Sequence, residues 1–291
     1  MIYTYEQNFK EKAYLVKRTW GKRCNNLLFM SNMTDPNNLI DITVLNVTES
    51  RDTLWKKTKL SFQHAYEHHL KDYDWFLKAD DDTYVIMENL RYYLYQYPTE
   101  LPLLFGYQFR RNFMSGGAGY ILSREAVRIF NEKALKDKEK CSQSDDGAED
   151  AEMASCLSAF NVTFGDTRDE FLKERFFPLD LDFLLNEEFT DKDFWYYTDA
   201  QYVHNETGLE CCSNTAIAFH YESPVHMLVF EYLLYHMKKN QIQLKIPDLP
   251  KKFSVDDTKI MFPRKNIGLY QKNSSQITAN NQIKQNVINL K

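Results

Sequence analysis

The chain has 291 residues, of which 43% are hydrophobic and 15% aromatic, enough apolar material for one large domain or two small ones. Its formal charge of −5 at pH 7 and its pI of about 5.9 exclude the broad basic surface that nucleic-acid binding requires. Apolar runs such as 227–235 are too short to cross a membrane, which takes roughly 20 residues, and Met1 begins no recognisable signal peptide. We therefore expect a folded domain with no nucleic-acid partner and no anchor within this sequence.

Short apolar runs alternate with helical patterns in the first half of the chain, as in a mostly parallel sheet with crossover helices. Apolar residues recur at helical spacing over 54–69 and again over 86–97, where Pro98 ends the second predicted helix. The predicted strands are Leu27–Met30, Ile42–Val47, Trp75–Ala79 and Leu103–Tyr107. This alternation predicts a Rossmann-like α/β fold.

Three aspartates, Asp80, Asp81 and Asp82, directly follow the predicted strand 75–79. In open α/β sheets, ligands bind in the crevice outside the carboxyl ends of the strands. Carboxylate oxygens suit Mg²⁺ or Mn²⁺, and such an ion suits a diphosphate. The motif therefore predicts a nucleotide-sugar site, although an acidic turn that caps the next helix is an alternative.

Further along the chain, three glycines within 116–119 allow the backbone to approach a ligand or another strand closely. Ser123 is placed to cap the helix that follows, and helices are also predicted over 149–157 and 225–235. A further strand is predicted over Ala216–His220. We assign 1–238 to one domain and 239–291 to a polar tail, for which we expect disorder from about residue 265.

The cysteines and the glycosylation sequons bear on the cellular compartment. Five sequons begin at Asn32, Asn46, Asn161, Asn205 and Asn273, and they have meaning only where glycosylation occurs. The five cysteines lack the spacing of a zinc site, and two bridges with one leftover thiol, an unusual pair between the adjacent Cys211 and Cys212, or buried free thiols are all open.

Several motifs in order resemble the β1,3-glycosyltransferase family, and within it the core 1 galactosyltransferases and their insect paralogues. The resemblance runs from about Asn8 to Tyr235. It rests on the segments 16–24, 74–85, 114–120, 149–150, 165–169, 194–196, 211–212 and 219–221. It implies a GT-A fold with a small C-terminal acceptor-side portion, a Golgi enzyme held by a type II membrane anchor, and inverting transfer of galactose from UDP-galactose to O3 of N-acetylgalactosamine on Ser or Thr of glycoproteins.

The resemblance also implies roles for individual residues. Asp82, His220 and Asp80 are the implied Mn²⁺ site: Asp82 and His220 would ligate the ion directly, and Asp80 would face the ribose or a metal-bound water. Asp150 resembles the general base, which contributes roughly 10²–10⁴-fold. Positions matching donor-binding residues are Arg51, Lys57, Asp80 and Asp81, and those matching acceptor-binding residues are Trp195, Glu149 and Gly117.

Purely structural interpretations are also open for several of these residues. Glu149 and Asp150 fit the acidic first turn of a helix, the glycines fit close packing of a strand, and His220 fits a buried strand. Two functional alternatives also stay open, namely a β1,3-glycosyltransferase with a different donor sugar and an inactive paralogue like the family's dedicated chaperone. The resemblance further implies a homodimer, and it implies a first strand longer than the short apolar segment at Ile2, so we expect that strand to be truncated.

Overall fold

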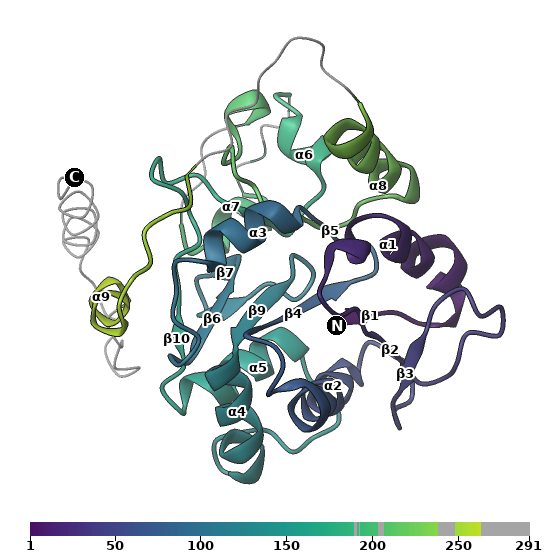
Figure 1. Cartoon of the computed structure of the whole chain (residues 1–291), viewed down its shortest axis with the longest axis vertical. Helices are drawn as coiled ribbons and strands as arrows, with labels where there is room; N and C mark the ends of the chain where they lie inside the picture. The colour runs from purple at the N-terminus through teal and green to yellow at the C-terminus, as the bar shows by residue number, and fades with distance from the viewer. Residues whose placement is uncertain (189–190, 192, 203–206, 238–247, 263–291) are drawn as a thin grey trace.

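The computed structural model describes residues 1–188, 191, 193–202, 207–237 and 248–262, most of which surround a seven-stranded sheet (Figure 1). In spatial order the strands are β10 (Thr163–Phe164), β6 (Leu103–Gly106), β9 (Tyr120–Ser123), β4 (Trp75–Asp80), β1 (Ile2–Tyr3), β2 (Phe29–Ser31) and β3 (Ile42–Val44). β9 runs antiparallel to both of its neighbours, and the other pairs are parallel.

The short strand β1 lies inside this sheet, between β2 and β4. Ile2 pairs with Phe29 on one side and with Ala79 on the other, and its side chain is buried. The amino group of Met1 donates a hydrogen bond to the carbonyl of Leu77 at 2.8 Å, and burial lowers its pKa to about 6. A two-residue strand therefore completes the ladder next to the three aspartates.

Helices cover both faces of the sheet (Figure 1). On one face lie α2 (Leu54–His69), α4 (Arg124–Glu132) and α5 (Glu149–Ser158), and on the other lie α1 (Tyr14–Arg18) and α3 (Met87–Leu94). The aromatic rings of Phe62, Phe130 and Tyr120 join α2, α4 and β9 in one buried cluster, with Phe62 stacked on Tyr120 at 6.2 Å. Ser123 caps α4 by accepting from the amide of Ala126, as predicted.

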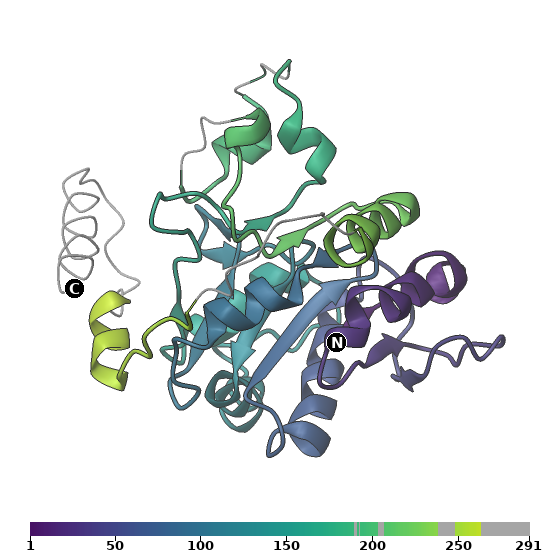
Figure 2. The ribbon, with the colours of Figure 1, turned by 45° about the horizontal axis from the view of Figure 1, so that its top comes forward.

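Two smaller sheets extend the main one. β5 (Tyr84–Val85) pairs antiparallel with β12 (Ala218–Phe219), which pairs with β11 (Phe176–Phe177), and a separate hairpin joins β7 (Gln108–Phe109) to β8 (Phe113–Met114). Figure 2 shows α6 (Leu181–Leu185), α7 (Trp195–Thr198) and α8 (Pro224–Glu231) gathered on this side of the molecule. The segment that carries His220 is thereby joined to the chain just after β4.

Short helical turns complete the description. They are η1 (Glu6–Asn8), η2 (Phe9–Ala13), η3 (Trp20–Arg23), η4 (Ala134–Lys136), η5 (Gly208–Glu210), η6 (Tyr232–His236) and α9 (Val255–Met261). The last of these, α9, lies within the predicted polar tail, and Phe262 behind it packs on Tyr97 and Phe105 of the core. Disorder was expected from about residue 265, which is outside the described residues. None of the described helices is long and apolar enough to span a bilayer.

The cysteines form two bridges and leave one thiol. Cys141 pairs with Cys156, which ties the loop before α5 to that helix, and Cys211 pairs with the adjacent Cys212. Cys24 is the free thiol. Two of the open alternatives therefore hold together, because one of the two bridges is the vicinal pair.

Candidate functional site

The three aspartates lie at the carboxyl end of β4, in the centre of the sheet. Asp80 is the last residue of that strand, and the turn after it is closed by a hydrogen bond from the amide of Thr83 to the carbonyl of Asp80 at 3.2 Å. β5 starts directly afterwards and pairs with β12, with Tyr84 opposite Phe219. The amide of Glu222 also donates to the carbonyl of Asp82 at 2.8 Å. These backbone bonds bring His220 beside the aspartates.

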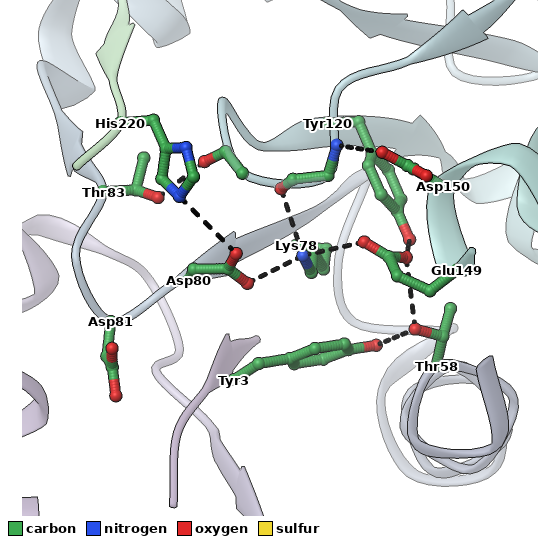
Figure 3. Close-up of polar contacts among 12 residues, drawn as sticks. Tyr3, Thr58, Lys78, Asp80, Asp81, Thr83, Tyr120, Glu149, Asp150 and His220 are labelled. Atoms are coloured by element: carbon green, nitrogen blue, oxygen red, sulfur yellow. Dashed lines mark hydrogen bonds and ion pairs between the residues drawn. The ribbon is translucent and has the colours of Figure 1, made fainter. Parts of the chain in front are cut away.

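Asp80, Asp82 and His220 form a compact group of potential metal ligands. Nε2 of His220 lies 3.3 Å from Oδ1 of Asp82 and 3.8 Å from Oδ2 of Asp80, and one ligand atom from each residue lies within 4.8 Å of the others. Figure 3 shows the Asp80 carboxylate and the His220 ring pointing toward each other. Two carboxylates and one imidazole suit a divalent first-row ion, and three protein donors leave coordination positions for a ligand.

The surroundings fit such an ion. A Cβ atom built on Gly117 would lie 2.1 Å from Cε1 of His220, so only glycine allows the imidazole this position. Burial raises the pKa of Asp82, but its contacts with His220 and with Nζ of Lys12, 2.9 Å away, hold that pKa well below the usual range. These contacts therefore favour the ionised carboxylate, which is the form that ligates a metal.

Asp81, in contrast, points away from this group (Figure 3). Its side chain is buried and accepts a hydrogen bond from Nδ2 of Asn8 at 3.1 Å, while Oδ2 has no partner among the described residues. Burial raises the pKa of Asp81 to about 7. The structure therefore separates the middle aspartate from its two neighbours, and its expected part in donor binding stays a prediction.

Glu149 and Asp150 begin α5, on the other side of the glycine loop. The amide of Gly116 donates to Oδ2 of Asp150 at 3.0 Å, and Asp150 is half-buried. Glu149 is buried, and its Oε2 accepts from the hydroxyls of Tyr120 at 3.0 Å and Thr58 at 3.2 Å. Burial raises the pKa of Glu149, an effect that is opposed by a neighbouring ammonium group.

That ammonium group belongs to Lys78, which the sequence analysis did not single out. Its Nζ lies 2.7 Å from Oδ1 of Asp80 and 2.9 Å from Oε1 of Glu149, and it is buried inside β4. Burial lowers the pKa of Lys78, but the two carboxylates raise it above its ordinary value overall, so the group is charged. The signal available in the sequence was a lysine within an apolar strand, where a charge needs partners.

Two further missed residues contact the metal-ligand group. Lys12, in the short helical turn η2, forms the ion pair with Asp82. Tyr221 stacks on the ring of His220, with 3.8 Å between centroids, and its φ of 59° lies in the left-handed region that aromatic residues rarely adopt. Its side chain is about half exposed beside the site.

The remaining predicted residues lie outside this group. Arg51 is exposed in the turn before α2. Lys57 is buried in α2, where Nζ donates to both carboxylate oxygens of Glu49 at 2.8 Å and to the carbonyl of Thr4 at 2.7 Å. Trp195 starts α7 and is half-buried, with its ring 6.1 Å from Phe109. The structure therefore joins the predicted metal ligands to one another, but it leaves the predicted phosphate contacts untested.

Comparison with known proteins gives a family match over the part of the chain that contains these site residues. The sequence model of the Fringe-like family matches residues 1–171, which include β4, the three aspartates and α5. The chain belongs to the Fringe-like family of glycosyltransferases. Its mixed sheet with helices on both faces is the GT-A type of architecture that the sequence analysis predicted.

Three relatives of this Fringe-like chain have names that describe enzymes acting on sugars. It is 40% identical over 249 residues to glycoprotein-N-acetylgalactosamine 3-beta-galactosyltransferase 1 of Xenopus laevis, a match that covers 84% of this chain and 68% of that protein. It is 25% identical over 147 residues to chondroitin sulfate synthase 3 of Homo sapiens, covering 44% of this chain but 17% of that protein. A beta-1,3-glucosyltransferase of Mus musculus is 23% identical over 168 residues, covering 55% and 33% respectively.

Proposed function

We propose that this Fringe-like glycosyltransferase moves galactose from UDP-galactose to O3 of N-acetylgalactosamine linked to Ser or Thr of glycoproteins, with inversion of the sugar linkage. The observation that carries the proposal is the 40% identity, across 84% of this chain, to a protein named for 3-beta-galactosyl transfer to that amino sugar. The ligand group at the carboxyl end of β4 supports it, because this is where an open α/β sheet binds a nucleotide.

Asp80, Asp82 and His220 would hold the divalent ion, which we propose to be Mn²⁺. When bound, such an ion neutralises charge on the diphosphate of a departing UDP. The chain's own residues keep this group ready, since Lys12 balances the Asp82 carboxylate and Gly117 leaves space for the imidazole. Two ligands come from the end of β4 and the third from the end of β12, so the ligand group depends on the pairing of β5 with β12.

Asp150 is our proposed general base for the acceptor hydroxyl. Its Oδ2 is oriented by the Gly116 amide and its Oδ1 by the amide of Ala151 at 2.9 Å, which fixes the carboxylate beside the glycine loop. A carboxylate is a weak base, but it needs only to accept the proton as the new bond forms. Glu149, Gly117 and Trp195 would contact the acceptor sugar, the last with its flat ring.

Arg51, Lys57, Asp80 and Asp81 are proposed to contribute to the donor site. Arg51 lies exposed in its turn and could offset phosphate charge. Lys57 donates to Glu49 in this structure. A direct contact with a phosphate would require this ion pair to open; otherwise the Lys57 charge would act on the phosphate without contact. The buried Asp81 would act through the backbone turn rather than by direct contact.

The compartment we propose is the lumen of the Golgi or secretory pathway. The two disulfides support an oxidising compartment, and the sequon residues Asn46 and Asn161 are exposed. A homodimer and a dedicated chaperone are proposed as protein partners only through the family resemblance.

A different donor sugar is the second candidate function. The matches to a chondroitin sulfate synthase and a beta-1,3-glucosyltransferase favour it. Each match spans about half of this chain, and neither protein is named for the transfer of galactose. An inactive, chaperone-like paralogue is disfavoured by the retained ligand group and by Asp150.

A donor-by-acceptor screen decides among these functions. The purified chain is incubated with each UDP-sugar and with peptides that carry or lack N-acetylgalactosamine, with Mn²⁺ added or chelated, and released UDP is measured. We expect release above background only with UDP-galactose, the glycosylated peptide and the metal together. Turnover with another UDP-sugar would replace the donor assignment, and a folded chain that turns over none would favour the inactive paralogue.

A further inference from the structure

We propose that Lys78 is a positioning residue that holds the metal-binding side and the base side of the site in fixed relation. It lies in the middle of the segment that carries the aspartates and is only 2% exposed. Lys78 is not among the residues proposed to bind the metal, the donor or the acceptor. The inference rests on the proposed function, because Asp80 and Asp150 matter here as the ligand and base of that reaction.

The Lys78 ammonium group contacts three oxygen atoms, two through hydrogen bonds and one, on Glu149, through an ion pair. Nζ lies 2.7 Å from Oδ1 of Asp80, 2.9 Å from Oε1 of Glu149 and 3.0 Å from the carbonyl oxygen of Gly116. Two hydrogen bonds and one ion pair therefore hold the ammonium group from three sides (Figure 3). The side chain thus acts as a three-way clamp rather than as a mobile surface charge.

Each acceptor belongs to a different part of the site. Asp80 is one of the predicted metal ligands and supplies its other oxygen, Oδ2, toward His220. Gly116 donates its amide to Asp150, so its carbonyl and its amide connect Lys78 to the proposed base through one residue. Glu149 precedes Asp150 at the start of α5. A shift of the ammonium group would therefore move both halves of the site.

The surroundings of Lys78 oppose its movement. The ring of Tyr3 lies 4.8 Å from Nζ and that of Tyr120 lies 5.9 Å away, and both are buried. The hydroxyl of Tyr3 donates to Thr58, which in turn donates to Oε2 of Glu149. The hydroxyls of Tyr3, Thr58 and Tyr120 and both carboxylate oxygens of Glu149 thus have partners, and a satisfied buried polar network favours one geometry.

Charge explains why a cation is needed at this position. Asp80 and Glu149 both approach the same nitrogen atom, and without a positive charge two carboxylates would face each other in a buried region. Repulsion would turn the partly exposed Asp80 out toward solvent, since Glu149 is enclosed and cannot move. Asp80 would then no longer present Oδ2 to the His220 side.

The test compares Lys78→Met with the double variant Lys78→Met/Glu149→Gln. The methionine keeps the length of the side chain but removes the cation, and the glutamine removes the carboxylate that the missing cation would leave unpaired, while its amide oxygen can still accept from Tyr120 and Thr58. Lys17→Met, at a partly exposed lysine that pairs with Asp41, is the matched control. Thermal melting and circular dichroism measure folding, and calorimetric titration with Mn²⁺ alone measures metal affinity.

We expect a 10- to 100-fold loss of Mn²⁺ affinity in Lys78→Met, the range typical for groups that orient metal ligands, and no change in Lys17→Met. The double variant is expected to recover thermal stability but not metal affinity, because it removes the repulsion between the two carboxylates without restoring the hydrogen bond from Nζ that orients Asp80. With UDP-galactose and glycosylated peptide, kcat is expected to fall at saturating metal while KM for the peptide changes little.

Wild-type Mn²⁺ affinity in a folded double variant would overturn the inference. Failure of both variants to fold would overturn it as well, because Lys78 would then serve the fold and not the site. The proposed function fails separately, when the wild-type chain binds Mn²⁺ and UDP but transfers no sugar. The affinity comparison does not depend on that outcome.

Discussion

Nε2 of His220 lies 3.3 Å from Oδ1 of Asp82, although the two residues belong to segments that leave different sheets. The contact exists because β5 and β12 pair directly between them. The imidazole is the ligand that sequence spacing alone could not have assigned, and removing it tests the proposed metal site most directly.

His220→Ala should lower Mn²⁺ affinity and metal-dependent UDP release by about 100-fold or more, because two carboxylates alone make a weaker and less selective site. Metal titration followed by UDP release measures both effects. His68→Ala is the matched control, since His68 is exposed on α2 and far from the ligand group in sequence. Unchanged metal dependence in His220→Ala would contradict the assignment.

Gly117→Ala should displace the imidazole, because the new methyl group would lie 2.1 Å from Cε1 of His220. Overpacking of this kind costs about 1–3 kcal/mol of unfolding free energy. In the double variant Gly117→Ala/His220→Ala the obstruction is gone, so the two substitutions should couple by about 0.5–3 kcal/mol in a denaturant cycle. Strict additivity of the two effects would show that Gly117 is required for another reason.

Asp150→Asn should lower kcat by roughly 10²–10⁴-fold while UDP and Mn²⁺ binding stay near wild type. The amide oxygen of asparagine can still accept from the Gly116 backbone, so the loop is expected to keep its position. Steady-state kinetics and calorimetry with UDP separate the two effects. Asp145→Asn, at an exposed carboxylate paired with Lys56, should leave both unchanged. Joint loss of binding and turnover in Asp150→Asn would argue against its role as base.

Glu231, which is not part of the candidate site, should make the stability of the fold depend on pH. Burial raises its pKa, but ion pairs with Arg23 at 2.8 Å and Lys22 at 2.5 Å lower it overall from 4.5 to about 2. Because the folded-state pKa is the lower one, the stabilisation is fully present above about pH 4.5 and is lost as pH falls toward 2. Glu231→Gln should therefore cost about 2 kcal/mol at pH 7 and progressively less in acid.

Urea unfolding at pH 7, 4.5 and 3 measures this difference between wild type and Glu231→Gln. Glu210→Gln, at an exposed pair with Lys173, serves as the control and should shift the midpoint little at any of these pH values. A cost for Glu231→Gln that grows as the pH falls would reverse the predicted sign and remove the ion pairs as its cause.

The long elements were predictable because their patterns are strong. The helical spacing over 54–69 corresponds to α2 with the same bounds, and the apolar run from Trp75 became β4 with Asp80 as its last residue. The two-residue strands β5 and β11 were not identified, since so few residues carry no periodicity. Yet β5 is the strand that brings His220 to the aspartates.

The site was predictable where its functional residues are consecutive in the sequence, and less so where they come together only through tertiary contacts. The aspartate motif marked one end of a strand, whereas His220 entered through the family resemblance. Lys78 and Lys12 were missed, because a lysine in sequence does not reveal which carboxylate it meets. The split orientation of the triad, with Asp81 turned inward, also required the fold.

A ligand group drawn from two sheets has a mechanical consequence. Any cation held between Asp80, Asp82 and His220 would brace the strand that ends in the aspartates against the small sheet containing β12. Ligands that bind only the folded chain raise its resistance to heat in proportion to the logarithm of their concentration. The melting temperature should consequently rise with added Mn²⁺. The concentration of the ion around the protein would then set how strongly the two sheets are held together.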